Sequence, residues 1–236
     1  MLVENSLQNW SYKKLKMYRS CPYSVYLKYI KRVKEPPIDP KFDAKRLRGI
    51  GAHDDLADCI NIGAAVPKEF DAFTDIIDGY RELNATAEED EFFDNHWNLV
   101  KKPEGVKFWN GYWLVVKKDV RMATGEFVLV VDWKTGKKHG NEVDHFEQMK
   151  LYAVTEWRKD PGFPEYCVEL QYLDKKDTWA HTFTPRELER HWAVFDKDVA
   201  VMMNDRFFRP KPSRLACQYC PFNHKNGSGA CPVAAV

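Results

Sequence analysis

Apolar residues recur at helical spacing through the first third of the chain. In the first stretch, Leu15, Tyr18 and Ile30 fall on one apolar, aromatic side, and lysines and arginines fill the other. A cluster of prolines ends this pattern, and apolar positions then recur on one face of two further stretches. The pattern therefore predicts three helices, at about 6–33, 42–61 and 69–83.

From Phe92 onward the apolar residues form short runs or alternate with polar ones, which is the spacing of β-strands. Thr124 and Gly125 form a turn signal between two of these runs and predict a hairpin. The acidic run Glu88–Glu91 precedes the first strand and is interpreted as a solvated connection. Strands are predicted at about 92–100, 112–120, 126–133, 165–174 and 178–184.

Two helices are predicted among and after these strands. An amphipathic stretch at about 141–159 separates the third strand from the fourth. A second stretch, at about 185–203, follows Thr184 and Pro185, a favourable pair at a helix start. The order of elements predicts an α/β fold in which a mixed central β-sheet is flanked by helices.

The end of the chain differs in character from the rest. From Arg209 onward it is rich in Pro, Gly, Asn and Cys and shows no periodicity. With 236 residues the chain is long enough for one sizeable core and a small appendage. We therefore expect a main domain at 1–208 and a cysteine-rich tail at 209–236.

Composition limits the kinds of partner that the chain can have. The 36 Lys and Arg nearly cancel the 35 Asp and Glu, and a net charge of +1 gives no global attraction to nucleic acid or anionic membranes. The first 20 residues contain no apolar run, and no stretch approaches the roughly 20 apolar residues that cross a bilayer. A soluble, cytoplasmic protein is expected, in the host cytoplasm if a phage encodes it.

Contact with DNA would have to come from local basic groups, each of which is by itself more typical of a solvated helix face. The basic groups are Lys13–Lys16 with Arg19, Lys28–Lys34, Lys45–Arg48 and Lys137–Lys138. Tyrosines that could stack on unpaired bases lie among them. These tyrosines are Tyr12, Tyr18, Tyr23 and Tyr26.

The sharpest chemical signal is the segment VVDWKTG at the end of the valine-rich run. Side chains alternate along a strand, so Asp132 and Lys134 should point to one side of the sheet and Trp133 to the other. Asp119 ends the preceding predicted strand. Two carboxylates on adjacent strands suit Mg²⁺ or Mn²⁺, and a nearby amine suits phosphodiester hydrolysis. A surface salt bridge is the ordinary alternative for an isolated Asp-x-Lys.

Several motifs together resemble one family. VVDWKTGK, the upstream Asp119, the pair Gln148 and Tyr152 on one helix, and GIGAHDDLA around His53 resemble the RecB-like branch of the PD-(D/E)XK nucleases. That branch includes CRISPR-associated RecB-like and phage exonucleases. The resemblance implies that His53, Asp119, Asp132 and the carbonyl of Trp133 hold the metal, that Lys134 is catalytic, and that Gln148 and Tyr152 lie near the substrate.

Three cysteines crowd the tail in the spacing Cys217-x2-Cys220-x10-Cys231. Thiolates at this spacing can converge on one metal, and a fourth ligand is then required. His224 would complete a zinc site, and Cys21 would complete a [4Fe-4S] cluster that joins the two ends of the chain. An empty site is the third alternative. The resemblance favours the cluster, because its iron–sulfur members use one N-terminal and three C-terminal cysteines.

The remaining thiols, Cys59 and Cys167, are expected to be core residues. The resemblance implies a metal-dependent exonuclease that processes DNA ends, single-stranded or free, in replication, recombination or repair. The alternative is a catalytically weak DNA-end-binding subunit of a larger complex. A zinc-binding regulatory protein would leave VVDWKTGK unexplained.

Overall fold

A six-stranded mixed sheet forms the centre of the protein. The computed structural model describes residues 6–107, 109–136, 138, 140–224 and 227–233. The strand order is β2-β1-β3-β4-β5-β6, and every neighbouring pair is antiparallel except β4 and β5. This confirms the predicted fold class. The strands are β1 (Thr86–Phe93), β2 (Leu99–Val100), β3 (Leu114–Ala123), β4 (Phe127–Lys134), β5 (Glu165–Tyr172) and β6 (Asp177–Phe183).

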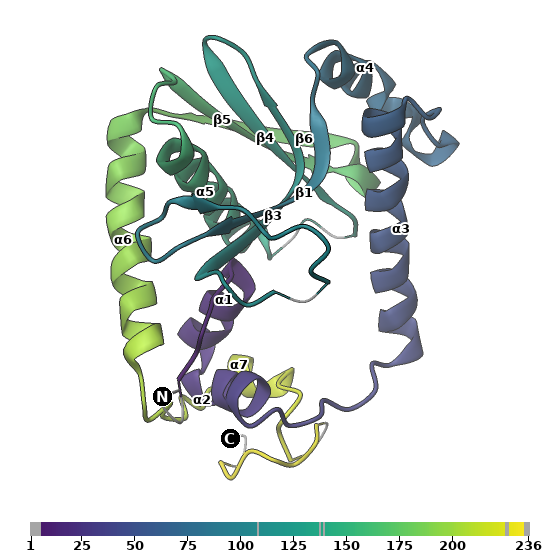
Figure 1. The fold of residues 1–236 in the computed structure, drawn as a ribbon. Coiled ribbons are helices and arrows are strands. Elements are labelled where there is room, and N and C mark those ends of the chain that lie inside the picture. Colours follow the sequence, from purple (N-terminus) through teal and green to yellow (C-terminus); the bar gives the residue numbers. More distant parts are fainter. Residues whose placement is uncertain (1–5, 108, 137, 139, 225–226, 234–236) are drawn as a thin grey trace.

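Helices cover both faces of the sheet (Figure 1). On one face lie α5 (Glu142–Lys159) and α6 (Pro185–Asn204), and on the other lie α3 (Pro40–Ile62), the 3-10 helix η2 (Lys68–Phe73) and α4 (Thr74–Glu82). Helix α5 makes the crossover that a parallel β4–β5 pair requires. None of the helices in the described ranges has both the length and the apolar character needed to cross a bilayer.

Each face of the sheet has its own core. Val128 and Val130 of β4 belong to the cluster with α5 and α6, whereas Leu129 and Val131 belong to the cluster with α3 and α4. Because both faces of β4 are covered, its sequence is an unbroken apolar run rather than an alternating one. Thr184 caps α6 with its side chain and forms a capping box with Glu187, as the sequence predicts.

The predicted helix at 6–33 is wrong, because the segment is divided at Cys21. It consists of α1 (Tyr12–Ser20), α2 (Pro22–Val25) and the π-helix η1 (Tyr26–Ile30). Cys21 is extended, with φ −158° and ψ 106°. Pro22 explains the break, since a proline disfavours helical geometry in the residue before it. The aromatic side of the segment still packs against the core.

The tail returns to this first segment. After α6, Phe208 is buried and its ring stacks on Tyr26 at 5.8 Å between centroids. The backbone N–H of Lys211 then donates to Sγ of Cys21 at 3.4 Å. A short helix, α7 (Arg214–Gln218), follows, and Figure 1 shows it beside α2. The two ends of the described chain therefore lie together.

The interpretation of Glu88–Glu91 as a solvated connection is also wrong, because these residues belong to β1. The strand predicted at 92–100 is in fact the end of β1 and the short β2, and the helix predicted at 69–83 begins as the 3-10 turn η2. A strand with four consecutive acidic residues has no apolar alternation to reveal it. Glu91 is nevertheless buried, and pairing with Lys118 explains how.

Lys118 and Glu91 belong to a buried ion cluster between the sheet and α5. The Nζ of Lys118, 1% exposed, lies 2.5 Å from Oε1 of Glu156, and Arg121 and Lys159 contact the same carboxylate at 3.0 and 2.9 Å. Burial by itself would raise the pKa of Glu156, but Lys118, Lys159 and Arg121 together outweigh it and lower the pKa to about 2. The cluster ties β1, β3 and α5 together.

Glu156→Gln should therefore destabilise the fold by about 3 kcal/mol at neutral pH, because it leaves buried cations short of negative charge. The folded-state pKa of Glu156 is depressed from 4.5 to about 2, so the carboxylate stabilises the fold above pH 4.5 and loses this effect as the pH falls toward 2. Urea unfolding of both proteins across this range tests the prediction.

The matched control is Glu147→Gln on the same helix, whose partly exposed pair with Lys150 should contribute less than about 1 kcal/mol. The gap in unfolding free energy between wild type and Glu156→Gln should narrow on acidification. A gap that stays constant from neutral pH to pH 3 would contradict the assigned role of Glu156.

Candidate active site

The β3–β4 hairpin brings two predicted carboxylates together. The strands turn at Thr124 and Gly125, and the register pairs Val120 with Val131, so Asp119 and Asp132 are the next residues on each strand. The backbone N–H of Trp133 donates to Oδ2 of Asp119 at 2.6 Å. Both aspartates are buried. The sequence alone left this register undetermined.

Strand β1 changes faces opposite Asp119. Ala87 packs in the core on the α3 side, whereas Glu91 and Phe93 point to the α5 side, although all three would share a face in a regular strand. The change occurs at Glu88, whose φ of +60° is left-handed and unusual for a residue with a side chain. Such backbone strain tends to occur at functional sites.

Strand β3 makes the same change at the same level. Val116 packs on the α5 side and Val120 on the α3 side, and Asp119 lies between them. The register pairs Ala87 with Val120 and Glu89 with Lys118, which leaves Glu88 beside Asp119. The paired distortion directs both carboxylates away from the buried ion cluster and toward α3.

His53 of α3 meets these carboxylates. Its Nδ1 lies 3.2 Å from Oδ1 of Asp119 and 3.4 Å from Oε1 of Glu88. Ligand atoms of these three residues lie within 4.8 Å of one another, and no other group of three or more His, Cys, Asp or Glu in the described residues does so. Sequence reasoning found His53 and Asp119 but missed Glu88, because one member of a run of four acids carries no distinguishing signal.

Helix α3 approaches the sheet closely near His53. A Cβ at Gly49 would lie 3.0 Å from Oγ1 of Thr135, just beyond the end of β4, so a side chain there would press on that loop. Gly49 therefore allows the close approach of α3 to the end of β4. Gly51 has no such part, because nothing lies within 4 Å of the position of its Cβ.

Lys134 joins the site from the same side of β4 as Asp132. Its ammonium pairs with Oδ2 of Asp132 and donates to Oε1 of Gln148 at 3.3 Å. Gln148 in turn donates to the hydroxyl of Tyr152 at 2.6 Å, and that hydroxyl donates to the carbonyl of Lys117 at 2.5 Å. The structure thus brings Gln148 and Tyr152 of α5 into a hydrogen-bonded chain that holds Lys134. The Trp133 side chain packs on the other face, as alternation predicts.

Burial and neighbouring charges shift the acidities of these groups. Burial raises the pKa of Asp132 to about 6, against the opposing effect of the Lys134 ammonium. Burial also opposes the charge of Lys134, but the carboxylates of Asp132 and Asp119 outweigh it and raise the pKa of that ammonium. The pKa of His53 is raised in the same way, with burial opposed by Asp119 above all.

The oxygens of this group suit a divalent cation. Oε1 of Glu88 is buried and makes no hydrogen bond, and the Lys134 ammonium is the partner of Oδ2 of Asp132. Buried carboxylate oxygens without hydrogen bonds are costly unless a cation neutralises them. His53, Glu88 and Asp119 converge from α3, β1 and β3, and Asp132 of β4 lies opposite Asp119 in the hairpin. This imidazole and these carboxylates form a donor set that Mg²⁺ or Mn²⁺ accepts. The residues present therefore fit a metal centre.

Two cavities flank the site and share Lys117. One, of about 410 Å³, lies beside Lys134 between α1 and α5, and Lys13, Lys16 and His145 help to line it. The other, of about 250 Å³, lies beside α3 and includes His53, Glu88 and Arg46. A substrate that spans both cavities would cross the carboxylates.

The tyrosines that were expected to stack on bases make contacts within the protein. The hydroxyl of Tyr18 donates to Asp205 at 2.8 Å, and Tyr26 stacks on Tyr23 and Phe208. Tyr12 donates to the carbonyl of Asp144 at 2.8 Å while lining the cavity beside Lys134. Of the basic pair after β4, Lys138 pairs with Asp177, and Lys137 lies outside the described residues.

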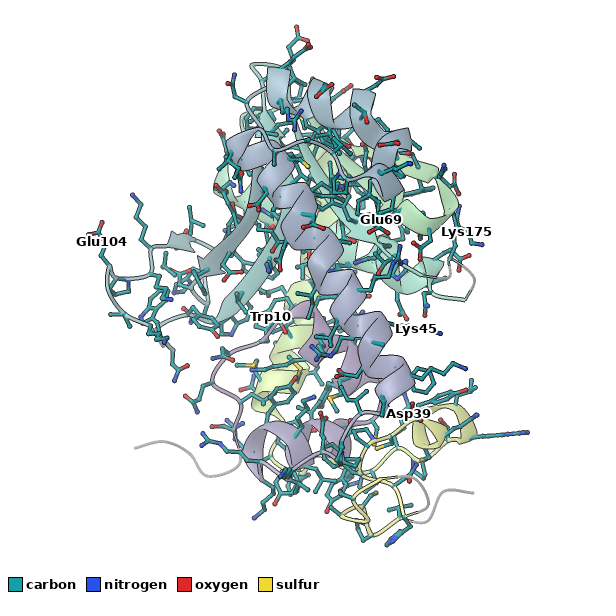
Figure 2. All side chains as sticks on the ribbon, turned by 90° about the vertical axis from the view of Figure 1, so that its right-hand side faces the viewer. Trp10, Asp39, Lys45, Glu69, Glu104 and Lys175 are labelled. Atoms are coloured by element: carbon teal, nitrogen blue, oxygen red, sulfur yellow. The ribbon has the colours of Figure 1, made fainter. Side chains whose placement is uncertain are left out.

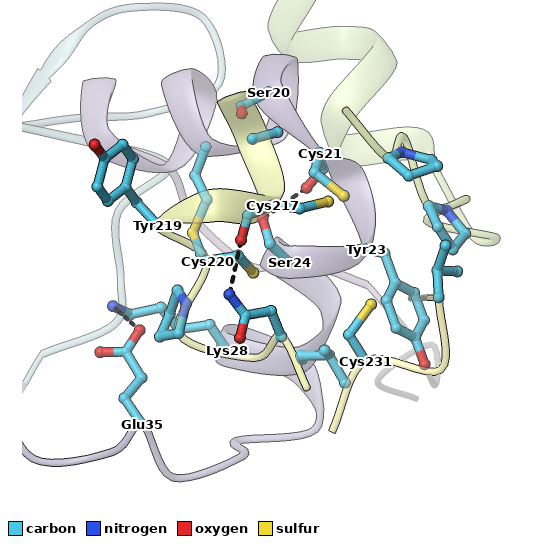
Figure 3. A pocket seen from close by; sticks show the side chains of 18 of the residues that line it. Ser20, Cys21, Tyr23, Ser24, Lys28, Glu35, Cys217, Tyr219, Cys220 and Cys231 are labelled. Atoms are coloured by element: carbon cyan, nitrogen blue, oxygen red, sulfur yellow. Dashed lines mark hydrogen bonds and ion pairs between the residues drawn. The ribbon is translucent and has the colours of Figure 1, made fainter. Parts of the chain in front are cut away.

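Four cysteines line one pocket of about 420 Å³ (Figure 3). Cys21 comes from the break between α1 and α2, and Cys217, Cys220 and Cys231 come from the tail. Burial and the other three thiols raise the pKa of Cys220. In the described residues no three thiols fall within 4.8 Å of one another, and His224 does not line the pocket. Cys59 is a buried core thiol as predicted, and Cys167 packs at the edge of the same core.

These observations can be set beside known proteins. Residues 114–224 match the PD-(D/E)XK nuclease superfamily. The PD-(D/E)XK match spans β3 to α7 and includes Asp119, Asp132 and Lys134. His53, Glu88 and Cys21 lie outside it, in the part of the chain that precedes β3.

Solved structures resemble the chain only distantly, and no curated protein matches it. The protein SSO0001 is 15% identical, with a TM-score of 0.40, over 98% of this chain and 89% of its own. A candidate exonuclease from Eubacterium rectale is 11% identical, with a TM-score of 0.47, over 92% of this chain and 88% of its own.

Glu88→Gln tests whether β1 contributes a ligand to a cation bound at this site. Gln has the same shape as Glu but lacks its charge. Mn²⁺ affinity, measured by isothermal titration calorimetry, should therefore fall about tenfold or more. Loss of a group that only hydrogen-bonds to a metal ligand already lowers metal affinity by about this factor. Glu189→Gln, an exposed change on α6, should leave the affinity unchanged. Equal affinities in wild type and Glu88→Gln would exclude Glu88 as a ligand.

Proposed function

We propose that this protein is a metal-dependent deoxyribonuclease that hydrolyses phosphodiester bonds, with Mg²⁺ or Mn²⁺ as cofactor. The observation that carries the proposal is the group formed by His53, Glu88 and Asp119, with Asp132 and Lys134 paired on the neighbouring strand and one buried carboxylate oxygen of Glu88 without a hydrogen bond. The match to a nuclease superfamily agrees with it.

The protein's own residues divide the work of hydrolysis. His53, Glu88, Asp119 and Asp132 would hold the cation, and the Trp133 carbonyl is proposed as a further ligand. When bound, the cation supplies Lewis-acid activation of water and neutralises charge on the phosphate. Lys134 is positioned by Asp132 and Gln148, and its raised pKa keeps it an ammonium that can stabilise negative charge in the transition state. The hydroxyl of Tyr152 accepts a hydrogen bond from Gln148 and so orients its side chain.

DNA would enter through the two flanking cavities. Lys13, Lys16 and Lys117 line the cavity beside Lys134, and Arg46 lines the cavity beside α3, so cations lie on both sides of the carboxylates. Phosphates of the same strand would bind these cations on either side of the scissile bond. The proposal that the enzyme acts as an exonuclease at DNA ends, in replication, recombination or repair, is supported by the resemblance of its motifs to the RecB-like branch.

A [4Fe-4S] cluster in the cysteine pocket is part of the proposal. A single zinc holds its sulfurs about 3.8 Å apart, given Zn–S bonds of about 2.3 Å. The wider spacing of these thiols, and a pocket of about 420 Å³ between them, suit a larger group. The cluster would be structural and would join the tail at 209–236 to Cys21 of the main domain at 1–208.

Asp132→Asn and Lys134→Ala should each lower degradation of labelled linear single-stranded DNA about 100-fold or more in Mg²⁺ or Mn²⁺, because each removes charge from the reacting centre. Glu189→Gln is the matched control and should retain full activity. Closed circular single-stranded DNA should resist the wild type.

Equal degradation by wild type and Asp132→Asn would contradict the assignment of the site. Cleavage of the circle by wild type but not by Asp132→Asn would support a nuclease and refute the end requirement. Tight binding to DNA ends without cleavage in either metal would instead favour the DNA-end-binding subunit.

Freshly purified protein should absorb in a broad band near about 400 nm that bleaches on reduction, as thiolate-bound iron does. Elemental analysis should find about four iron atoms per chain. Cys220→Ser should abolish the band, because it removes a thiol on the pocket wall, whereas Cys167→Ser, outside the pocket, should retain it. One zinc per chain without the band would refute the cluster.

A further inference from the structure

Three aromatic side chains near the β2–β3 loop belong to neither core cluster. The rings of Phe92, Trp109 and Tyr112 contact one another at centroid distances of 5.0 to 5.8 Å. With Lys102, Lys107 and Asn110 they line a cavity of about 250 Å³, which we call the aromatic cavity. All three aromatic residues are partly exposed.

The Trp109 ring packs against its own loop. A Cβ added at Gly111 would lie 2.3 Å from Nε1 of Trp109 and 2.6 Å from the neighbouring ring carbon. The indole therefore lies against the backbone of Gly111, where only glycine leaves room for it. The edge of the ring also meets Phe92, at an interplanar angle of 75°. A ring held before a ligand arrives loses little freedom on binding.

Lysines line the cavity, and the carboxylate of Asp90 lies near its Tyr112 wall. Lys101, Lys102 and Lys107 are exposed, and Nζ of Lys102 donates to the carbonyl of Lys107 at 3.4 Å across the loop. The loop's own carboxylate, Glu104, projects from its far end, away from the body of the protein (Figure 2). Lysine is depleted at protein–protein interfaces, whereas lysine beside aromatic rings is the usual arrangement for unpaired nucleic acid.

The aromatic cavity continues along the same strands that carry the metal ligands. Phe92 lies four residues after Glu88 on β1, a separation of roughly 13 Å at about 3.3 Å per residue. Asp90, between them, pairs in register with Lys117, the residue shared by the two cavities that flank the carboxylates. A strand of DNA that leaves the active site past Lys117 can follow β1 and β3 to Phe92.

We propose that the aromatic cavity binds an unpaired base of the single-stranded DNA whose backbone passes the carboxylates. The base stacks on Trp109, and Phe92 and Tyr112 form the other walls. Lys102 and Lys107 contact the neighbouring phosphates, and the amide of Asn110 offers a donor and an acceptor to the edge of the base. The inference rests on the proposed nuclease function, because that function places the DNA strand beside the carboxylates. It adds a binding site outside the catalytic group and a preference for single strands.

Trp109→Ala tests the proposal by binding, without the need for cleavage. Stacking on one aromatic ring contributes about 1–3 kcal/mol, so the Kd for a labelled oligothymidylate, measured by fluorescence anisotropy in EDTA, should rise about 5- to 150-fold. Trp109→Phe keeps a ring and should lose less. Phe207→Ala is the control, because Phe207 is 80% exposed and follows α6, far along the chain from this loop.

Two further measurements separate this site from the catalytic group. Turnover of bis(p-nitrophenyl) phosphate, a phosphodiester too small to reach the aromatic cavity, should be the same for Trp109→Ala and wild type in Mn²⁺. Affinity for blunt duplex DNA should also be unaffected, since its bases are paired. Lys107→Gln should lower the slope of log Kd against log salt by about one, through one lost phosphate contact.

The outcomes separate this proposal from the proposed function. Unchanged oligothymidylate affinity in Trp109→Ala would refute the base site and leave the surface to a partner of another kind. Equal loss of duplex affinity would refute stacking on unpaired bases. Absence of any turnover in wild type would refute the nuclease, while the anisotropy result would still decide whether unpaired bases bind here.

Discussion

The reversal of faces at Glu88 and Asp119 is the constraint on which the rest of the site depends. Strand alternation counted from Ala87 and Val120, which pack on the α3 side, would point both carboxylates to the α5 side. At Glu88, where the backbone is left-handed, the side chains of β1 exchange faces of the sheet, and those of β3 exchange faces beside it. Glu88 and Asp119 then meet His53 of α3, whereas Glu91 and Lys118 on the same two strands point to the opposite face. The left-handed φ of Glu88 is unfavourable, but it gives the carboxylates a position that a regular strand does not offer.

The same reversal separates two groups of charges that differ in how far they are neutralised. On the α5 side, Lys118, Arg121 and Lys159 surround Glu156 and lower its pKa. At the site, Asp132 has only one ammonium beside it, and its pKa is raised. Both groups are buried, so the difference lies in partners rather than in exposure. The carboxylate of Glu156 is therefore fully neutralised, whereas that of Asp132 is not. A bound cation would supply the missing positive charge.

The sequence predicted those parts of the structure that depend on local pattern. The apolar run of β4, the turn at Thr124 and the two long helices follow from periodicity and capping, and the alternation of Asp132, Trp133 and Lys134 follows from strand geometry. Glu88 could not be predicted, because its role depends on a backbone angle and on a strand 30 residues away. Cys21 was expected in one long helix, although Pro22 already carried the signal for the break. Local chemistry could be predicted from the sequence, whereas contacts between segments far apart in the chain could not.

Helix α1 separates the cysteine pocket from the cavity beside Lys134, and Lys13 and Lys16 line both. The helix is only nine residues long and ends at Cys21, where the tail closes over it. The two cavities therefore have a common partition, one side of which faces Lys134. Whatever fastens the tail to Cys21 also sets the position of α1, so residues that never touch the substrate would partly determine the width of the proposed substrate entrance.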